Sequence, residues 1–341
     1  MKLAMTLLLR DEADIVEAHI VYHLEAGVDV VIATDHRSSD DTTEILESYA
    51  RRGYVHLIRR EDERIRQSEW VTHMARLAAT EHGADWVINS DADEFWWPRE
   101  GSLKEVLAAV PQGYGVVSAV SRPFVPRPGS DWFAERMTAR LALTAPLNDP
   151  ATPYRHVAKV AHRADPRVVV QQGNHRVSGL PDRELSGWSP LEVLHFPLRT
   201  SEQAAGKHEN TWTAWALNLR GDIARARSVF DAGRPAAFYE RVVVDDLTLR
   251  RGLEEGWLVE DTRLRNALRA LRDPSGRFVD PAGGGPQLRF GSPSFAEDAS
   301  RALESVLLAE AHSVRLQRRA DELAARIDCG RTAAVYGSAP R

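Results

Sequence analysis

The amino-acid sequence predicts an α/β fold in which an open, mostly parallel sheet is flanked by helices. Two observations carry this prediction. Up to Pro98, short apolar runs alternate with segments whose apolar side chains recur at helical spacing, which is the pattern of repeated βαβ units. A glycine follows each of the three segments with helical spacing, at Gly27, Gly53 and Gly83, where helices commonly end. Parallel strands joined by right-handed crossovers account for both observations.

The predicted elements of the first half follow in regular order. Strands are expected at 3–9, 30–33, 54–58 and 86–88, because each is a short apolar run suited to a sheet covered on both faces. Helices are expected between them, the third over residues 68–82. The side chains at helical spacing are Ala13, Val16, Ile20 and Leu24, then Ile45, Leu46 and Tyr49, then Trp70, Met74 and Leu77.

The second half is less regular. Further strands are predicted at 115–120, 168–170 and 191–194. Residues 122–153 are rich in Pro, Trp and Arg with little periodicity, which predicts a long loop. A helical pattern runs over residues 201–230, and its core residues are expected to be Trp212, Trp215 and Leu219.

These patterns predict one folded domain in two halves, residues 1–121 and 122–272. Residues 273–295 are rich in Gly and Pro and predict a linker or a surface loop. Residues 296–341 predict an amphipathic helix and a tail. That helix would cap the domain or pair with a second copy of the chain to give a homodimer.

Composition excludes several classes of protein. Of the 341 residues, 43% are hydrophobic and 27% charged, which is typical of a soluble globular chain. The net charge of −5 provides no basic field for nucleic acid or an anionic membrane. No apolar run reaches bilayer-spanning length, and charged residues cut the N-terminal run short, as in a strand rather than a signal peptide. The single Cys329 excludes an intramolecular disulfide, and a cytoplasmic location is expected.

Polar clusters stand directly after the predicted strands. Asp11 and Glu12 follow the first strand, Asp35 follows the second, and residues 91–94 follow the fourth. The cluster after the third strand includes Arg59, Arg60, Arg64 and Arg66. Because the carboxyl ends of parallel strands share one edge of the sheet, where ligands of open α/β sheets bind, the sequence predicts a binding crevice there.

The cluster after the fourth strand is the densest in charge. Asp91, Asp93 and Glu94 place three carboxylates within four residues. Three anions this close repel one another unless a cation relieves them, and hard oxygen ligands suit Mg²⁺ or Mn²⁺. A solvated acidic turn is the alternative interpretation. The chain has neither a G-x-G-x-x-G dinucleotide fingerprint after its first strand nor a G-x-x-x-x-G-K-[ST] phosphate loop.

Three motifs follow one another along the first half: residues 8–15 with 22–28, residues 35–42, and residues 91–95. Together they resemble motifs of bacterial family 2 glycosyltransferases, which have the GT-A fold, and the first is similar to the opening of those enzymes. Residues 35–42 stand where that family has a D-x-x-S-x-D-x-T loop, although His36 and Arg37 replace the residues common there. Residues 91–95 stand at the place of its D-x-D motif.

A fourth motif lies in the second half. Residues 195–203, with Lys207, are similar to a His-aromatic-x-x-Arg-Ser/Thr segment of one subgroup of that family. The resemblance covers residues 1–125 well and 155–210 loosely. It implies a GT-A-like nucleotide-sugar-binding half and an acceptor-side half.

The resemblance also implies a role for each matching residue. Asp93 would ligate a divalent cation, Mn²⁺ or Mg²⁺, and His195 would be a further metal or phosphate contact. Asp35 would hold the uracil or ribose of the donor, and Asp91 would contact the ribose or the metal's water shell. The segment that would line the same nucleotide pocket consists of Arg10, Asp11 and Glu12.

The function implied is metal-dependent transfer of a sugar from a nucleotide-diphosphate donor, with a UDP-sugar favoured, to a glycan or small-molecule hydroxyl. Arg64 or Arg66 would stabilise the charge that develops on the leaving diphosphate. In an inverting reaction a base must take the acceptor proton, and Glu184 or Asp182 is the candidate. Two alternatives remain open: a phosphohydrolase or phosphotransferase with Asp91 as nucleophile, and a non-catalytic nucleotide- or glycan-binding module.

Overall fold

The computed structural model describes residues 1–129, 131–142, 157–185, 190–207, 239–240, 242–281, 288, 290, 309, 313–321 and 323. By its internal contacts the chain divides into two compact units, residues 1–291 and 292–341. In the second unit, residues 313–321 are helical, and the apolar side chains of Val314 and Leu316 are exposed. The predicted core residues Trp212, Trp215 and Leu219 lie outside the described residues.

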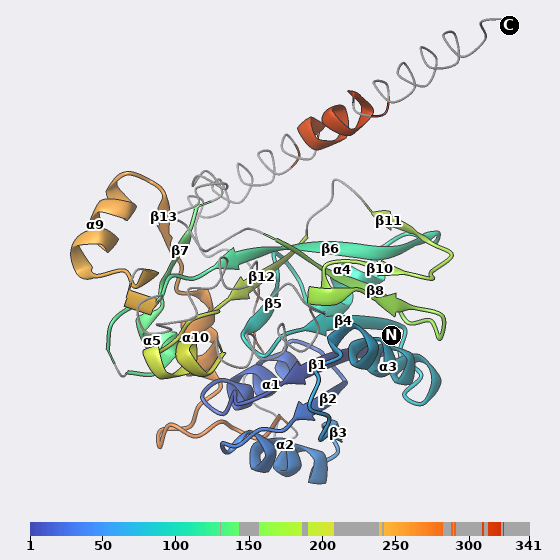
Figure 1. The fold of residues 1–341 in the computed structure, drawn as a ribbon, viewed down its shortest axis with the longest axis horizontal. Coiled ribbons are helices and arrows are strands. Elements are labelled where there is room, and N and C mark those ends of the chain that lie inside the picture. Colours follow the sequence, from blue (N-terminus) through green and yellow to red (C-terminus); the bar gives the residue numbers. More distant parts are fainter. Residues whose placement is uncertain are drawn as a thin grey trace, which may run out of the picture. The chain divides into compact units, whose positions relative to one another are not determined.

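The first unit is an α/β structure built on one large mixed sheet (Figure 1). This confirms the predicted fold class. The strands of its main path run in the order β3-β2-β1-β4-β8-β6-β12-β5, and β11 also pairs with β6. The first four strands are β1 (Leu3–Leu9), β2 (Val30–His36), β3 (Val55–Arg60) and β4 (Trp86–Ser90), and the pairings among these four are parallel.

The strands after β4 add antiparallel pairings to the sheet. They are β5 (Glu94–Pro98), β6 (Tyr114–Pro123), β8 (Ala158–Arg163), β11 (Arg183–Leu185) and β12 (Leu191–His195). β8 inserts between β4 and β6 and runs antiparallel to both, and β12 runs antiparallel to β5. β12 and β11 each run parallel to β6.

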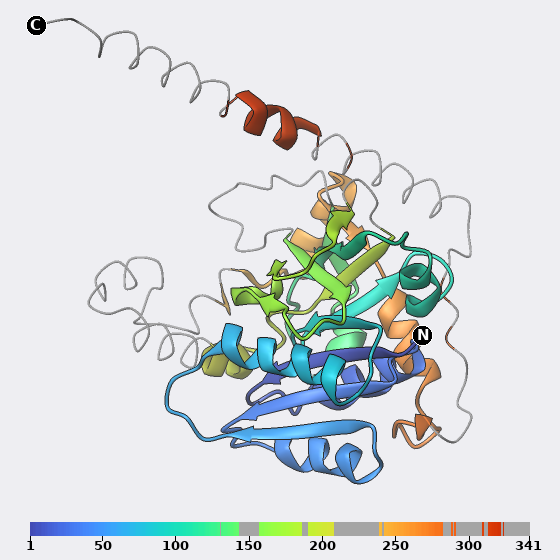
Figure 2. The same ribbon diagram turned by 90° about the vertical axis from the view of Figure 1, so that its right-hand side faces the viewer.

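Helices cover both faces of the parallel strands, as Figure 2 shows for β1 to β3 between α2 and α3. Alternation along the strands sorts the side chains between the two faces. The helices are α1 (Val16–Glu25), α2 (Thr42–Arg51) and α3 (Gln67–Thr80). The cluster under α3 includes Ala4, Val30, Ile32, Val71 and Met74. The cluster under α1 and α2 includes Met5, Val31, Ala33, Ile20 and Leu46.

The remaining elements are short. They are α4 (Leu103–Ala108), α5 (Phe133–Arg136), β7 (Ala139–Leu141), β9 (Val169–Val170), the 3₁₀ turn η1 (Gln172–Asn174), β10 (Val177–Ser178), α9 (Asp246–Glu254), β13 (Leu258–Glu260) and α10 (Arg263–Ala270). Two of them correct the prediction of a loop over 122–153, because α5 and β7 lie inside it. β7 pairs antiparallel with β13, more than a hundred residues away, so no local pattern marks it.

The segment after α10 is tied to the first half of the chain. Asp280 accepts a hydrogen bond from the Tyr54 hydroxyl at 2.8 Å. Phe278, Leu288 and Phe290 pack against the main core. In the parts of the chain that the structure describes, no helix combines the length and apolarity needed to cross a membrane.

Candidate functional site

The predicted crevice is present as a cavity of about 840 Å³ at the carboxyl ends of β1 and β4. Residues 8–12, from the end of β1 and the turn after it, line the cavity, as do residues 91–94 after β4. From the second half, Lys159, His195 and Lys207 complete its wall. Elements far apart in the sequence therefore meet at one edge of the sheet.

The acidic cluster is held in a tight turn between β4 and β5. The backbone N–H of Glu94 donates to the carbonyl of Asp91 at 3.1 Å, and the N–H of Asp91 donates to Glu94 Oε2 at 3.3 Å. The N–H of Phe196 donates to the carbonyl of Asp93 at 2.8 Å, which fixes the turn against the end of β12. The register of β12 on β5 pairs His195 with Glu94. Backbone pairing thus brings the imidazole to the carboxylates.

Asp93, Glu94 and His195 form a group that fits a divalent cation. One ligand atom from each lies within 4.8 Å of the others, and His195 Nε2 is 3.5 Å from Asp93 Oδ1. Both carboxylates are buried, whereas His195 is partly exposed to the cavity. Two carboxylates suit Mn²⁺ or Mg²⁺, and the imidazole adds a nitrogen ligand of the kind that transition-metal ions accept.

Two lysines neutralise these carboxylates. Lys159 Nζ lies 2.7 Å from Asp91 Oδ2 and 2.8 Å from Glu94 Oε1. Lys207 Nζ contacts Asp93 Oδ2. Although burial opposes ionisation, Lys207 and His195 hold the pKa of Asp93 well below its usual range. For Glu94 burial prevails over Lys159 and raises the pKa to about 6.

The turns after β1 and β2 are hydrogen-bonded to each other. Asp11, in the left-handed region at φ 54°, accepts bonds at Oδ1 from the N–H and hydroxyl of Ser39 at 2.7 and 3.0 Å. The N–H of Glu12 donates to Thr42 Oγ1 at 2.9 Å. The pair of turns therefore forms one rim of the cavity, to which Arg10, Asp11, Glu12 and His36 contribute.

The carboxylate of Asp35 makes its hydrogen bonds within this rim. It is buried at the end of β2, where its carboxylate accepts bonds from the N–H and hydroxyl of Ser38 at 3.2 and 2.6 Å and from the Thr43 hydroxyl at 2.5 Å. It is not among the residues that line the cavity, whereas its neighbour His36 is. Its geometry is that of a residue that shapes the turn.

Arg199 joins the second half of the chain to the first. Its guanidinium is fully buried, contacts Glu12, and donates to both oxygens of Asp14 at 2.6 and 2.8 Å. Burial raises the pKa of Glu12 against the lowering effect of Arg199. The turn after β1 is thus fixed to the segment that follows β12.

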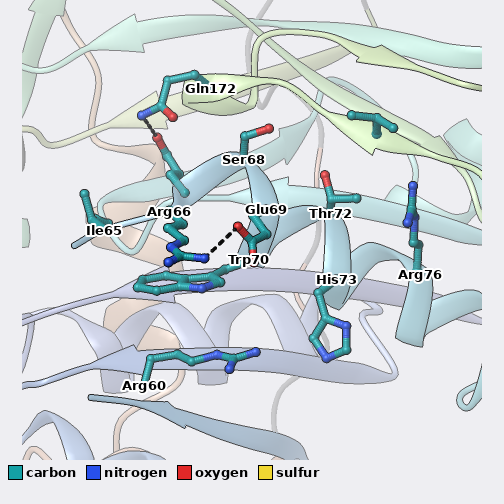
Figure 3. Close-up of a pocket in the computed structure, with 12 residues that line it drawn as sticks. Arg60, Ile65, Arg66, Ser68, Glu69, Trp70, Thr72, His73, Arg76 and Gln172 are labelled. Carbon is teal, nitrogen blue, oxygen red and sulfur yellow. Dashed lines mark hydrogen bonds and ion pairs between the residues drawn. The ribbon is translucent and has the colours of Figure 1, made fainter. Parts of the chain in front are cut away.

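The arginines after β3 lie beside this cavity, not in it. Arg66 lines a second cavity of about 740 Å³ along α3, where it forms an ion pair with Glu69 at 3.5 Å (Figure 3). Arg60 and Arg76 line this second cavity as well. Arg64 is exposed and lines neither cavity. The side chains shared by both cavities are Ile65, Gln67 and Gln172.

Glu184 and Asp182, the predicted bases, are not brought to the cavity. β11 pairs with the start of β6, with Arg183 opposite Tyr114, and the Glu184 carboxylate accepts from the Ser118 hydroxyl at 2.7 Å. Glu184 itself pairs with Val116, whereas His195 pairs with Pro123 at the other end of β6, about 23 Å away at roughly 3.3 Å per residue. The prediction of these two residues as bases is therefore corrected.

A comparison with known families gives one match. Residues 8–115 match the family model of glycosyltransferase family 92. The match is to a glycosyltransferase family, as the motifs predicted, but not to family 2, with which they were compared. A search of curated protein sequences finds no match.

Many solved structures are similar to this chain at a low level, and two of them serve as examples. Glucosyl-3-phosphoglycerate synthase from Mycobacterium tuberculosis, in complex with Mn²⁺, UDP and glucosyl-3-phosphoglycerate, is 20% identical with a TM-score of 0.26. The match covers 38% of this chain and 45% of that one, so the chain spans less than half of the synthase. Residues 1–349 of S. aureus TarS, in complex with UDP, are 11% identical with a TM-score of 0.34, over 86% of this chain and 100% of that one. Scores this low carry no conclusion about substrate.

Two residues at the carboxylates were missed by sequence reasoning. Lys159 reaches them because β8 lies beside β4, a pairing that no local pattern announces. Asn174, at φ 60°, donates from Nδ2 to Asp91 Oδ1 at 3.2 Å. The scarcity of lysine was a signal for Lys159 in the sequence. Of the 44 Lys and Arg residues, the lysines are only Lys2, Lys104, Lys159 and Lys207.

Proposed function

We propose that this chain is a glycosyltransferase that moves a sugar from a nucleotide-diphosphate donor to a hydroxyl acceptor with the help of a divalent cation. The observation that carries the proposal is the group of Asp93, Glu94 and His195 in a cavity at the carboxyl edge of the sheet. The match of residues 8–115 to glycosyltransferase family 92 supports the same reaction class.

In this proposal residues 1–121 hold the nucleotide sugar and residues 122–272 face the acceptor. Asp93, Glu94 and His195 would hold the ion, which when bound supplies positive charge to the leaving diphosphate. Arg10, at the rim of the cavity, adds a positive group of the chain itself. A UDP-sugar is the first donor to test, and the reaction is proposed to invert the sugar centre.

Asp91 is assigned a positioning role in this proposal. Its Oδ2 is paired with Lys159 at 2.7 Å and its Oδ1 accepts from Asn174 at 3.2 Å. Both oxygens of Asp91 are thus engaged by neighbouring side chains, which favours a positioning role over that of a nucleophile. Asp91 would orient Lys159 and the turn that carries Asp93.

The test measures the melting temperature of the protein with nucleotide diphosphates, in the presence and in the absence of Mn²⁺. A ligand at one hundred times its dissociation constant stabilises the native state by about 2.7 kcal/mol, which raises the melting temperature by roughly 5 °C. We expect UDP to give this shift only with Mn²⁺. The Asp93→Asn variant should lose the shift and keep its fold, because one charge is removed and the shape is kept.

Asp29→Asn is the matched control. Asp29 also pairs with a lysine, Lys104, at 2.7 Å, but it stands before β2, at the opposite edge of the sheet. This variant should keep the Mn²⁺-dependent shift. If no nucleotide diphosphate binds the wild-type protein under either condition, or if Asp93→Asn responds like the wild type, the proposed function is wrong.

A further inference from the structure

Lys207 is ion-paired with Asp93, which would bind the divalent cation in the proposed function. Asp93 is 2% exposed, and each of its oxygens faces a different group. Oδ2 contacts the Lys207 ammonium, while Oδ1 lies 3.5 Å from His195 Nε2. A cation bound by Asp93, Glu94 and His195 must therefore share Asp93 with Lys207 or displace it.

The presence of lysine at position 207 is informative, because nearly all other basic residues of this chain are arginines. Of its four lysines, Lys159 and Lys207 both lie on the acidic cluster. An ammonium is a compact point charge on a flexible stem, whereas a guanidinium is a planar fork suited to fixed pairing. Arg199, which holds Glu12 and Asp14 in place, shows the second use in the same region.

The two lysines differ in their freedom to move. The Lys159 side chain is 5% exposed and is held between Asp91 and Glu94. The Lys207 side chain is 39% exposed, lines the cavity, and has a single carboxylate within ion-pair distance among the described residues. Lys207 can therefore leave Asp93 without disturbing the core, and Lys159 cannot.

Charge balance gives the direction of that movement. With both lysines in place, Asp91, Asp93 and Glu94 face two positive charges. A divalent cation would bring two more, and like charges beside one carboxylate repel each other. A donor diphosphate entering the same cavity is an anion with which the displaced ammonium can pair.

We propose that Lys207 is a positioning residue of the donor site that exchanges with the divalent cation. Its ammonium holds Asp93 until the cation binds and then moves to the donor diphosphate. The first step depends only on the carboxylates and Lys207. The second step rests on the proposed function.

The experiment for the first step is a calorimetric titration of nucleotide-free protein with Mn²⁺. Lys207→Met keeps the length of the side chain and removes its charge. We expect it to bind Mn²⁺ about tenfold more tightly than the wild type, because the ammonium no longer competes with Mn²⁺ for Asp93; a tenfold change corresponds to about 1.4 kcal/mol. Lys207→Arg retains a competing charge and should stay within about twofold of the wild type.

Lys104→Met is the matched control, because Lys104 also pairs with a carboxylate at 2.7 Å, away from the cavity. Its Mn²⁺ affinity should equal that of the wild type. Equal or weaker Mn²⁺ binding by Lys207→Met, or absence of Mn²⁺ binding by both proteins, would overturn the exchange. Because no nucleotide is present, this result does not depend on the proposed function.

The second step is tested by titrating UDP at saturating Mn²⁺. Lys207→Met should bind UDP about tenfold more weakly than the wild type, opposite in sign to its change in Mn²⁺ affinity. If wild-type UDP affinity is the same with and without Mn²⁺ while Lys207→Met loses it, Lys207 replaces the metal permanently and the exchange is refuted. If UDP binds neither protein while the Mn²⁺ affinities differ as expected, the exchange stands and the proposed function fails.

Discussion

The substitution Arg199→Met should weaken the contacts that hold the two halves of the chain together. This change keeps most of the apolar stem and removes the guanidinium that contacts Glu12, Asp14 and the carbonyl of Phe196. Those contacts fix the turn after β1 to the segment after β12, and both segments line the cavity. Stability and ligand binding should therefore fall together.

The magnitude follows from the burial of each partner. Removing one member of a buried ion pair costs about 3–5 kcal/mol, because the other charge is left uncompensated. The Asp14 side chain is 43% exposed and regains water, whereas the Glu12 side chain is only 11% exposed. We therefore expect a loss near the lower limit, about 3 kcal/mol, or a fall in melting temperature of roughly 4–5 °C.

The loss should also depend on pH. Burial already raises the pKa of Glu12 against the effect of Arg199, so without the arginine this pKa rises further. A carboxyl whose folded pKa lies above its unfolded value contributes stability at low pH that is lost as pH rises. The deficit of Arg199→Met should therefore be smaller near pH 5 than near pH 8.

Thermal and urea unfolding of three variants would measure these effects. Arg167→Met is the control, because Arg167 pairs with Asp165 at the surface and its loss should change little. Adding Glu12→Gln to Arg199→Met should restore part of the stability, since both charges of the pair are then gone. The reasoning is refuted if Arg199→Met melts within about one degree of the wild type, as Arg167→Met should.

Two further predictions concern the rim and the sheet. Asp35→Ala leaves the Ser38 and Thr43 donors without their acceptor, at a cost of about 1–3 kcal/mol, and because Asp35 shapes the rim without lining the cavity, this cost should appear in the free energy of unfolding; an unchanged melting temperature would contradict this role. His162 is fully buried, and burial lowers its pKa from 6.5 to about 4. Its contribution is complete above pH 6.5 and falls by about 2 kcal/mol by pH 5. Urea unfolding at pH 7 and pH 5 should show a smaller change for His162→Gln, and an equal change would contradict the assignment.

The parallel half of the sheet could be predicted because its signals are local. Each strand is a short apolar run, each helix has a period that a single segment displays, and glycines mark the ends. The carboxyl-edge rule then placed Asp11, Glu12, Asp91 and Asp93 near one another without knowledge of side-chain contacts. The same rule could not show that Asp35 turns its oxygens to Ser38 and Thr43, because that choice depends on the turn that follows.

The second half depends on pairings between distant segments. Lys159 reaches Asp91 only because β8 runs antiparallel beside β4, and Glu184 is remote only because β11 adds to the start of β6. Neither register can be predicted from the alternation of side chains in a single segment. Charge and position in the sequence were therefore not enough to show which residues of the second half lie at the cavity. The place of His195 was expected from the resemblance and not from any spacing in the chain.

The position of His195 is also set from the other end of its strand. Glu192, three residues earlier on β12, is fully buried among Arg99, Arg122 and Arg263, at 3.3, 2.7 and 2.8 Å. Despite burial, these arginines hold the pKa of Glu192 well below its usual range, so it stays ionised. A slip of β12 by one residue would turn Glu192 to the other face and leave a buried charge without partners, at a cost of several kcal/mol. Because the same slip would also move the imidazole off Glu94 and Asp93, the ion pairs that fix the sheet fix the geometry of the candidate metal group as well.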